Sequence, residues 1–81
     1  MSDKITKFLR KLSGAEEQRV LETRNRILAN NLAGLDVKKL VGWDNFYRVR
    51  VGRVRIIFQS TDGENEIVHI SWRDDQTYRD F

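Results

Sequence analysis

The 81-residue sequence contains no cysteine and no long apolar segment. Without cysteine, neither a disulfide nor a thiolate-bound metal can supplement the small core that a chain of this length buries. No uninterrupted apolar run is longer than residues 56–58, and the N-terminus lacks the apolar stretch of a signal peptide. The sequence therefore indicates neither a membrane span nor export, and we expect a cytoplasmic protein.

The composition predicts a single folded domain over residues 1–81, because chains divide into domains only when one core outgrows roughly 250 residues. Hydrophobic residues make up 40% of the chain and charged residues of both signs 33%, which is typical of a globular chain and not of a disordered one. The net charge is only +3. Its meaning depends on where the arginines lie, because local patches attract phosphate backbones.

Residues 3–33 have the apolar spacing of two helices. Ser2 and Asp3 can cap the first helix, whose apolar positions are Ile5, Phe8, Leu9 and Leu12. The second helix begins at the capping box formed by Ser13 and Glu16. Its apolar stripe, interrupted by Arg24, consists of Val20, Leu21, Ile27, Leu28 and Leu32, and the residues that can end it are Asn30, Asn31 and Gly34. We expect an αα-hairpin whose apolar stripes form core.

From residue 46 onward the pattern alternates with a period of two, which predicts strands at 46–51 and 54–58 joined at Gly52. If Gly52 and Arg53 are the central turn residues, Arg50 lies opposite Arg55. If Val51 and Gly52 are central, Arg48 lies opposite Arg55 instead. Either register keeps the apolar side chains on one face and the arginines on the other.

A second turn signal at residues 61–63 precedes a third strand at 66–72. Regular alternation places Ile67, His69 and Ser71 on one face of that strand, with Val68, Ile70 and Trp72 on the other. Residues 35–45 are interpreted as a connector. The expected order is two helices followed by three antiparallel strands.

The arginines at positions 48, 50, 53 and 55 are the main candidates for functional residues. Like charges opposite one another destabilise a sheet, so their clustering needs an explanation. One explanation is a solvated face relieved by acids such as Glu64 and Glu66. The other is an anion site on an RNA or DNA surface, because the guanidinium fork donates two hydrogen bonds to a phosphate and keeps its charge.

The end of the third strand adds candidates to this surface. Arg73 has the parity of His69. If the strand is regular as far as residue 73 and this parity faces the side of the arginines, one concave patch would hold Arg48, Arg50, Arg55, His69, Arg73 and Tyr78. A single histidine on a strand is more often packed or hydrogen-bonded than catalytic, and tyrosine is likewise more often a packing residue. Both readings stay open for His69 and Tyr78.

Several motifs follow one another in order along the chain: L-D-V-K-K-L-V-G at 35–42, F-Y-R-V-R-V-G at 46–52, V-R-I-I-F at 54–58 and I-S-W-R at 70–73, followed by Tyr78. Together they resemble the RelE/ParE superfamily of bacterial and archaeal toxins, over roughly residues 5–78. The resemblance implies an α+β fold in which an N-terminal αα-hairpin packs on a small curved antiparallel sheet of three to four strands. The strand that usually precedes the first helix is missing or very short, which would leave one sheet edge open to pairing.

The resemblance also implies a function, the toxin component of a type II toxin–antitoxin system. In the ribonuclease branch such a toxin cleaves mRNA on the ribosome, without metal or cofactor, by attack of the 2′-hydroxyl on the adjacent phosphate. The catalytic residues would be Arg48, Arg55, Arg73, Tyr78 and His69, and the RNA-binding residues Arg48, Arg50, Arg53, Lys38 and Lys39. Arginine scarcely deprotonates, so the general base would be His69, Tyr78, Asp74 or Asp75. One histidine and no cysteine give no metal-ligand spacing, which leaves carboxylate-bound Mg²⁺ as the metal alternative.

Two other functions stay open. A ParE-like protein would inhibit DNA gyrase by binding, and a degenerate family member would bind an antitoxin or RNA without catalysis. The expected partners are a cognate antitoxin that folds on binding, the ribosome with its mRNA, and operator DNA through the toxin–antitoxin complex, with no membrane.

Overall fold

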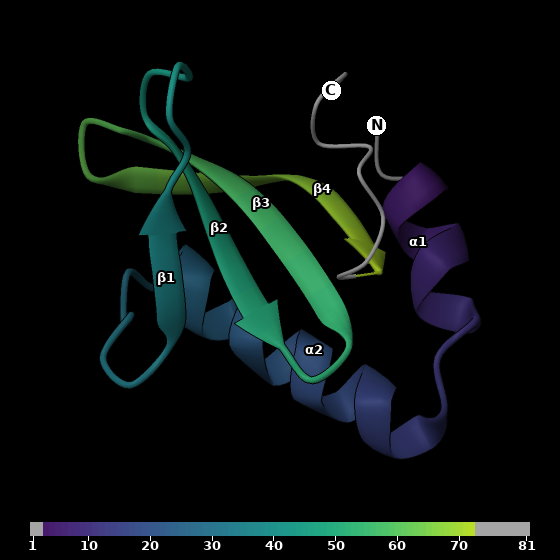
Figure 1. Ribbon diagram of the computed structural model, residues 1–81. Coiled ribbons are helices and arrows are strands. Elements are labelled where there is room, and N and C mark those ends of the chain that lie inside the picture. Colours follow the sequence, from purple (N-terminus) through teal and green to yellow (C-terminus); the bar gives the residue numbers. More distant parts are fainter. Residues whose placement is uncertain (1–2, 73–81) are drawn as a thin grey trace.

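A computed structural model of the chain describes residues 3–72, in which two helices pack on a four-stranded sheet (Figure 1). Helix α1 covers Asp3–Arg10 and helix α2 covers Gly14–Leu28. The strands β1 (Asp36–Lys39), β2 (Phe46–Val51), β3 (Val54–Thr61) and β4 (Glu64–Trp72) follow in that order. Helix α1 begins at the first described residue, and within residues 3–72 no helix is long and apolar enough to cross a membrane.

Helix α2 begins as the sequence predicts and is terminated by Asn30, the first of the three residues predicted to end it. The Glu16 amide donates to Ser13 Oγ and the Ser13 amide donates to Glu16 Oε1, so the capping box is confirmed. At the other end Asn30 adopts a left-handed conformation, with φ of 58°. The Asn31 amide then donates to the Arg26 carbonyl and the Asn30 amide to the Ile27 carbonyl, the pattern of a Schellman motif.

The end of α2 determines which of the last apolar residues of its stripe are buried. Val20 and Ile27 are fully buried, but Leu28 is 50% exposed, so its assignment to the core is wrong. Leu32 lies beyond the helix and packs against the core from the loop. Ser2 and the side chain of Ile5 lie outside the described part of the chain.

The sheet is an antiparallel meander of order β1-β2-β3-β4. Strand β1 lies within residues 35–45, which the sequence pattern assigns to a connector, and that assignment is wrong for Asp36–Lys39. The strand pairs along β2, with Val37 opposite Val49. A strand of this length with a single apolar side chain shows no alternation from which it could be predicted.

The two later turns follow from their residues. Val51 pairs with Val54 and Arg50 with Arg55, which confirms the register with Gly52 and Arg53 in the turn. Gly52 has φ of 59° and Arg53 does not have a positive φ, as a type II′ turn requires. Between β3 and β4, Asp62 and Gly63 both have positive φ, the signature of a type I′ turn.

A β-bulge interrupts the predicted alternation of β4. Ile57 pairs with His69 while its neighbour Phe58 pairs with Ile67, so one residue of β4 is extra. Ile67 therefore packs against the core with Ile70, while His69 shares the face of Ile57. The prediction that Ile67 and His69 lie on one face is wrong, because strict alternation cannot hold across a bulge.

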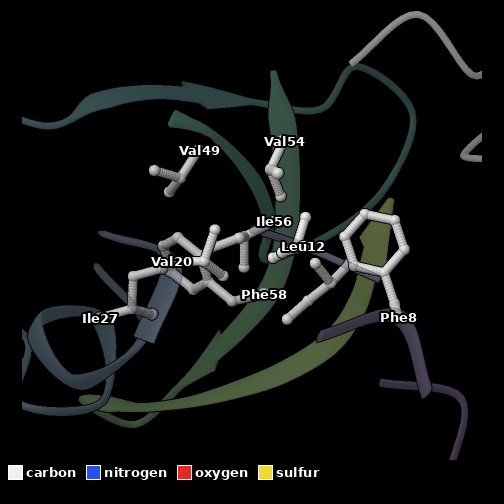
Figure 2. Close-up of a cluster of buried hydrophobic side chains, with 9 residues drawn as sticks. Phe8, Leu12, Val20, Ile27, Val49, Val54, Ile56 and Phe58 are labelled. Carbon is white, nitrogen blue, oxygen red and sulfur yellow. The ribbon is translucent and has the colours of Figure 1, made fainter. Parts of the chain in front are cut away.

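The core lies between the sheet and both helices (Figure 2). Its buried side chains are Phe8, Leu12, Val20, Ile27, Val49, Val54, Ile56, Phe58 and Ile70. Phe8 also packs edge-on against Trp72, with ring centroids 4.9 Å apart. The helices thus cover one face of the sheet, and the opposite face carries the arginines.

The Gly52 turn yields a stability test with an internal control. Gly52→Ala places a Cβ at positive φ and 3.5 Å from the Arg19 guanidinium, so we expect the free energy of unfolding to fall by about 1–2 kcal/mol. Gly14→Ala, at a helical position with open space around it, should leave stability unchanged or raise it by about 0.4–1 kcal/mol. Urea unfolding of the two variants checks this, and equal effects would contradict the turn geometry.

Candidate anion-binding site

A hollow of about 840 Å³ lies on the face of the sheet opposite the helices. The charged residues of the described chain that line it are the cations Lys38, Lys39, Arg48, Arg50, Arg53 and Arg55. Its other lining residues are Leu40, Val41, Trp43 and Trp72. Within residues 3–72 no carboxylate lines it, so this part of the chain concentrates positive potential there although the net charge is small.

The strand register brings these cations together. Arg50 lies directly opposite Arg55, and Arg48 lies opposite Lys38, so like charges face each other across two strand pairs. Such pairs destabilise a sheet. An anion bound between them would remove the repulsion, because each guanidinium can donate two parallel hydrogen bonds to a phosphate or carboxylate.

The cations differ in how firmly they are held. The Arg48 side chain is only 12% exposed and its Nη1 lies 3.9 Å from Asp36 Oδ2. Arg55 is 8% exposed. Lys38, Lys39 and Arg50 are exposed and make no ion pair within residues 3–72. Arg48 and Arg55 therefore form a partly desolvated floor where charge interactions are strong, with exposed cations around it.

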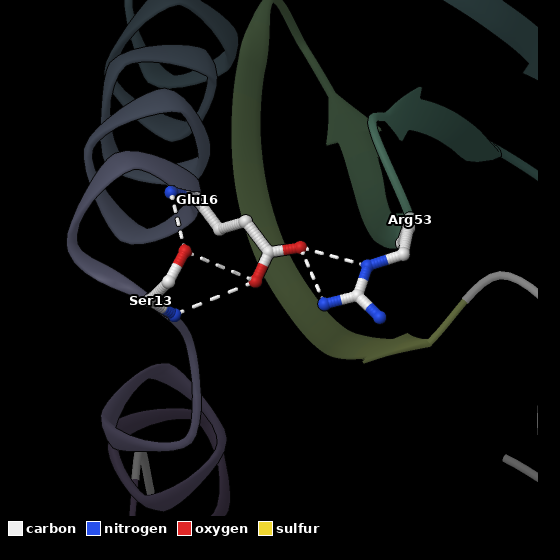
Figure 3. Close-up of polar contacts among 3 residues, drawn as sticks. All are labelled: Ser13, Glu16 and Arg53. Atoms are coloured by element: carbon white, nitrogen blue, oxygen red, sulfur yellow. Dashed lines mark hydrogen bonds and ion pairs between the residues drawn. The ribbon is translucent and has the colours of Figure 1, made fainter.

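Arg53 is fixed at one end of the hollow by a helix (Figure 3). Its Nε donates to Glu16 Oε2 at 2.8 Å, and its Nη2 forms an ion pair with the same oxygen at 2.8 Å. Its guanidinium carbon lies 5.0 Å from the centroid of the Trp72 ring. The other oxygen of Glu16 serves the capping box. This donation by Arg53 is the main reason why the pKa of the Glu16 carboxyl lies below its ordinary value of 4.5.

The other end of the hollow is aromatic and apolar. Trp43 contacts Phe46 in a T-shaped arrangement with ring centroids 5.8 Å apart. Val41 is 93% exposed. Sequence reasoning missed these residues because they lie in the assumed connector. Trp43 lies between the turn-forming residues Gly42 and Asn45, both with positive φ. An aromatic residue within a turn is the signal by which the sequence could have indicated this end of the hollow.

The sequence-predicted site residues divide into three groups. The first group lines the hollow and consists of Lys38, Lys39, Arg48, Arg50, Arg53 and Arg55. His69 is half-buried beside Ile57 and does not line the hollow. Arg73, Asp74, Asp75 and Tyr78 lie outside the described residues. Glu64 and Glu66 pair with Thr61 and Gln59 on the sheet and do not line the hollow.

Ser71 is a further polar residue on the arginine face, directly opposite Arg55. It is 4% exposed, and its buried Oγ has no hydrogen-bond partner within residues 3–72. A buried hydroxyl without a partner costs stability.

Comparison with known proteins gives a likeness to a solved structure. The structure resembles a solved structure described as the RelB–RelE antitoxin–toxin complex from Methanococcus jannaschii, with a TM-score of 0.69 and 27% sequence identity. The match covers 84% of this chain and 82% of that chain. No family model and no curated protein matches the sequence. Two helices on a four-stranded antiparallel sheet thus form the RelE-like α+β fold that the motifs predicted, and the likeness points to a toxin–antitoxin component.

The contact between Glu16 and Arg53 predicts a pH-dependent stability. The pKa of Glu16 is lowered in the folded chain, so its contribution is present at neutral pH and is lost as the pH falls through that lowered value. We expect Glu16→Gln to unfold at a lower temperature than the parent at neutral pH, with the difference shrinking in acid. Glu17→Gln, in the same helical turn, is the control for the loss of a charge there. A difference between the parent and Glu16→Gln that stays constant with pH would contradict the assignment.

Ser71→Ala tests whether the buried hydroxyl costs stability. Because Ser71 Oγ has no partner within residues 3–72, we expect the free energy of unfolding to stay constant or rise by about 1 kcal/mol. Thr23→Val, which removes a buried hydroxyl that donates to the Arg19 carbonyl at 2.9 Å, should bring no such gain. Urea unfolding measures both, and a clear loss for Ser71→Ala would show that the hydroxyl has a partner.

Proposed function

We propose that the protein is the toxin of a type II toxin–antitoxin pair and that it cleaves mRNA on the ribosome. The observation that carries the proposal is the hollow that six cations of residues 3–72 line on the helix-free face of a RelE-like sheet. RNA suits such a surface because its backbone presents one negative charge per nucleotide, and neutralising it releases condensed counterions. The fold alone would not decide the activity, so the proposal depends on this surface.

The chemistry of the hollow suits phosphodiester cleavage by an adjacent 2′-hydroxyl. The attack develops extra negative charge on the phosphate oxygens, and donors already oriented toward that charge lower the barrier. In this proposal the buried Arg55 and the partly buried Arg48 stabilise the transition state together with Arg73. The exposed Lys38, Lys39 and Arg50, with Arg53, hold the flanking phosphates. The reaction needs no cofactor, because the nucleophile belongs to the substrate.

Groups other than these cations must transfer the protons of the reaction. Arginine keeps its proton at neutral pH, so it cannot accept the proton of the 2′-hydroxyl. The proposal therefore assigns the general base and acid to His69, Tyr78, Asp74 or Asp75. Of these, His69 is the one within the described residues, beside Ile57 on the arginine face.

The proposed partner is a cognate antitoxin with an acidic, extended segment. The similar solved structure is an antitoxin–toxin complex, and a segment rich in carboxylates would complement the cations of the hollow. Such a segment would compete with RNA for the same arginines. Toxicity and its neutralisation would then depend on one surface.

Primer extension on mRNA in a purified translation system tests the function. We expect ribosome-dependent cuts by the parent protein, reduced about 100- to 1,000-fold in Arg55→Lys, which keeps the charge but loses the bidentate fork, and in Arg73→Ala. Arg10→Ala removes an exposed cation on α1 that does not line the hollow and should cut normally. Circular dichroism confirms that each variant is folded.

Two results would overturn the ribonuclease assignment. Inhibition of gyrase supercoiling without mRNA cleavage would make the protein a ParE-like inhibitor. Antitoxin binding without either activity would make it a non-catalytic member of the superfamily.

A further inference from the structure

The hollow is not uniform along its length, and its end next to the loop between β1 and β2 has a composition that phosphate binding alone does not require. Leu40, Val41 and Trp43 line that end beside Lys38 and Lys39. Val41 is 93% exposed, an unusual position for an apolar side chain at the rim of a cationic surface. A ligand that is only a polyanion would gain nothing from these side chains, whereas a ligand with alternating phosphates and flat apolar groups would.

Trp43 is held in place before any ligand arrives. Backbone hydrogen bonds close its loop, from the Leu40 amide to the Phe46 carbonyl at 3.0 Å and from the Trp43 amide to the Leu40 carbonyl at 3.4 Å. Leu40 is buried and anchors the loop to the body of the protein. The edge-to-face contact with Phe46 then sets the orientation of the indole. A ring held in this way loses little conformational entropy when a second ring stacks on it.

We infer that Trp43 is a stacking platform for a nucleobase and that the hollow binds a single-stranded RNA segment whose phosphates follow the arginines. The inference rests on the proposed function and assigns to it a residue that reads the base. Strand β2, with six residues between the Trp43 loop and the Gly52 turn, spans about 20 Å at roughly 3.3 Å per residue. That length accommodates a few nucleotides with the base at one end on Trp43. A duplex would not fit this arrangement, because its base faces are already stacked on one another.

Competition binding separates base stacking from charge. The probes are a fluorescent oligoadenylate and unlabelled inorganic polyphosphate of matched charge, at low ionic strength. We expect Trp43→Ala to weaken oligoadenylate binding by about 5- to 150-fold, the range that one stacked base contributes, and to leave polyphosphate binding within about 2-fold. Trp43→Tyr, which keeps a ring, should retain most of the oligoadenylate affinity.

Two further comparisons exclude a merely structural role for Trp43. Oligouridylate, whose base stacks less strongly, should lose less affinity in Trp43→Ala than oligoadenylate does. Leu28→Ala, which truncates an apolar side chain that is 50% exposed on α2 and does not line the hollow, should bind every probe as the parent does.

The outcomes distinguish the inference from the proposed function. Equal losses for oligoadenylate and polyphosphate in Trp43→Ala, or no loss for either, would overturn the stacking role and leave the arginine surface intact as an RNA site. If the parent protein binds neither probe, the arginine surface is not an RNA site and both proposals fail. If it binds polyphosphate as tightly as oligoadenylate, the surface takes acidic partners in general and the stacking role is again overturned.

Discussion

The register of the hairpin between β2 and β3 decides which face of the sheet carries charge and which carries the core. Gly52 and Arg53 in the turn place Val51 opposite Val54 and Arg50 opposite Arg55. A slip of one residue in either strand would turn its arginines toward the helices and its valines toward solvent. Burying an unpaired guanidinium in the core is so costly that the hydrophobic effect enforces the register of the charged face as well as that of the apolar one.

The same turn joins the two layers of the molecule. Arg53 leaves the turn to meet Glu16, and Glu16 is part of the cap of α2. The start of a helix, the end of a hairpin and one end of the cationic hollow therefore share one carboxylate. Trp72, under the Arg53 guanidinium, extends this contact to Phe8 of α1. One end of the hollow and the packing of the helices thus depend on the same small group of side chains.

Features set by neighbouring residues could be predicted from the sequence, while features set by distant ones could not. The capping box and the Gly52 turn depend on adjacent residues, and both are confirmed. Strand β1 was missed because only its pairing with β2 makes it a strand. The bulge in β4 likewise depends on its pairing with β3. The shared face of Arg48, Arg50 and Arg55 follows from alternation. The contact between Glu16 and Arg53 joins residues 37 apart, and no local pattern indicates it.

The position of β1 at the edge of the sheet gives its lysines a second consequence. An edge strand offers unpaired amides and carbonyls to any other strand, including one from another copy of the same chain. Lys38 and Lys39 lie on this edge, exposed and without an ion pair within residues 3–72. Two copies joined edge to edge would bring these ammonium groups together, so their repulsion opposes self-association. The charges that line the hollow therefore also help to keep the protein from aggregating through its sheet.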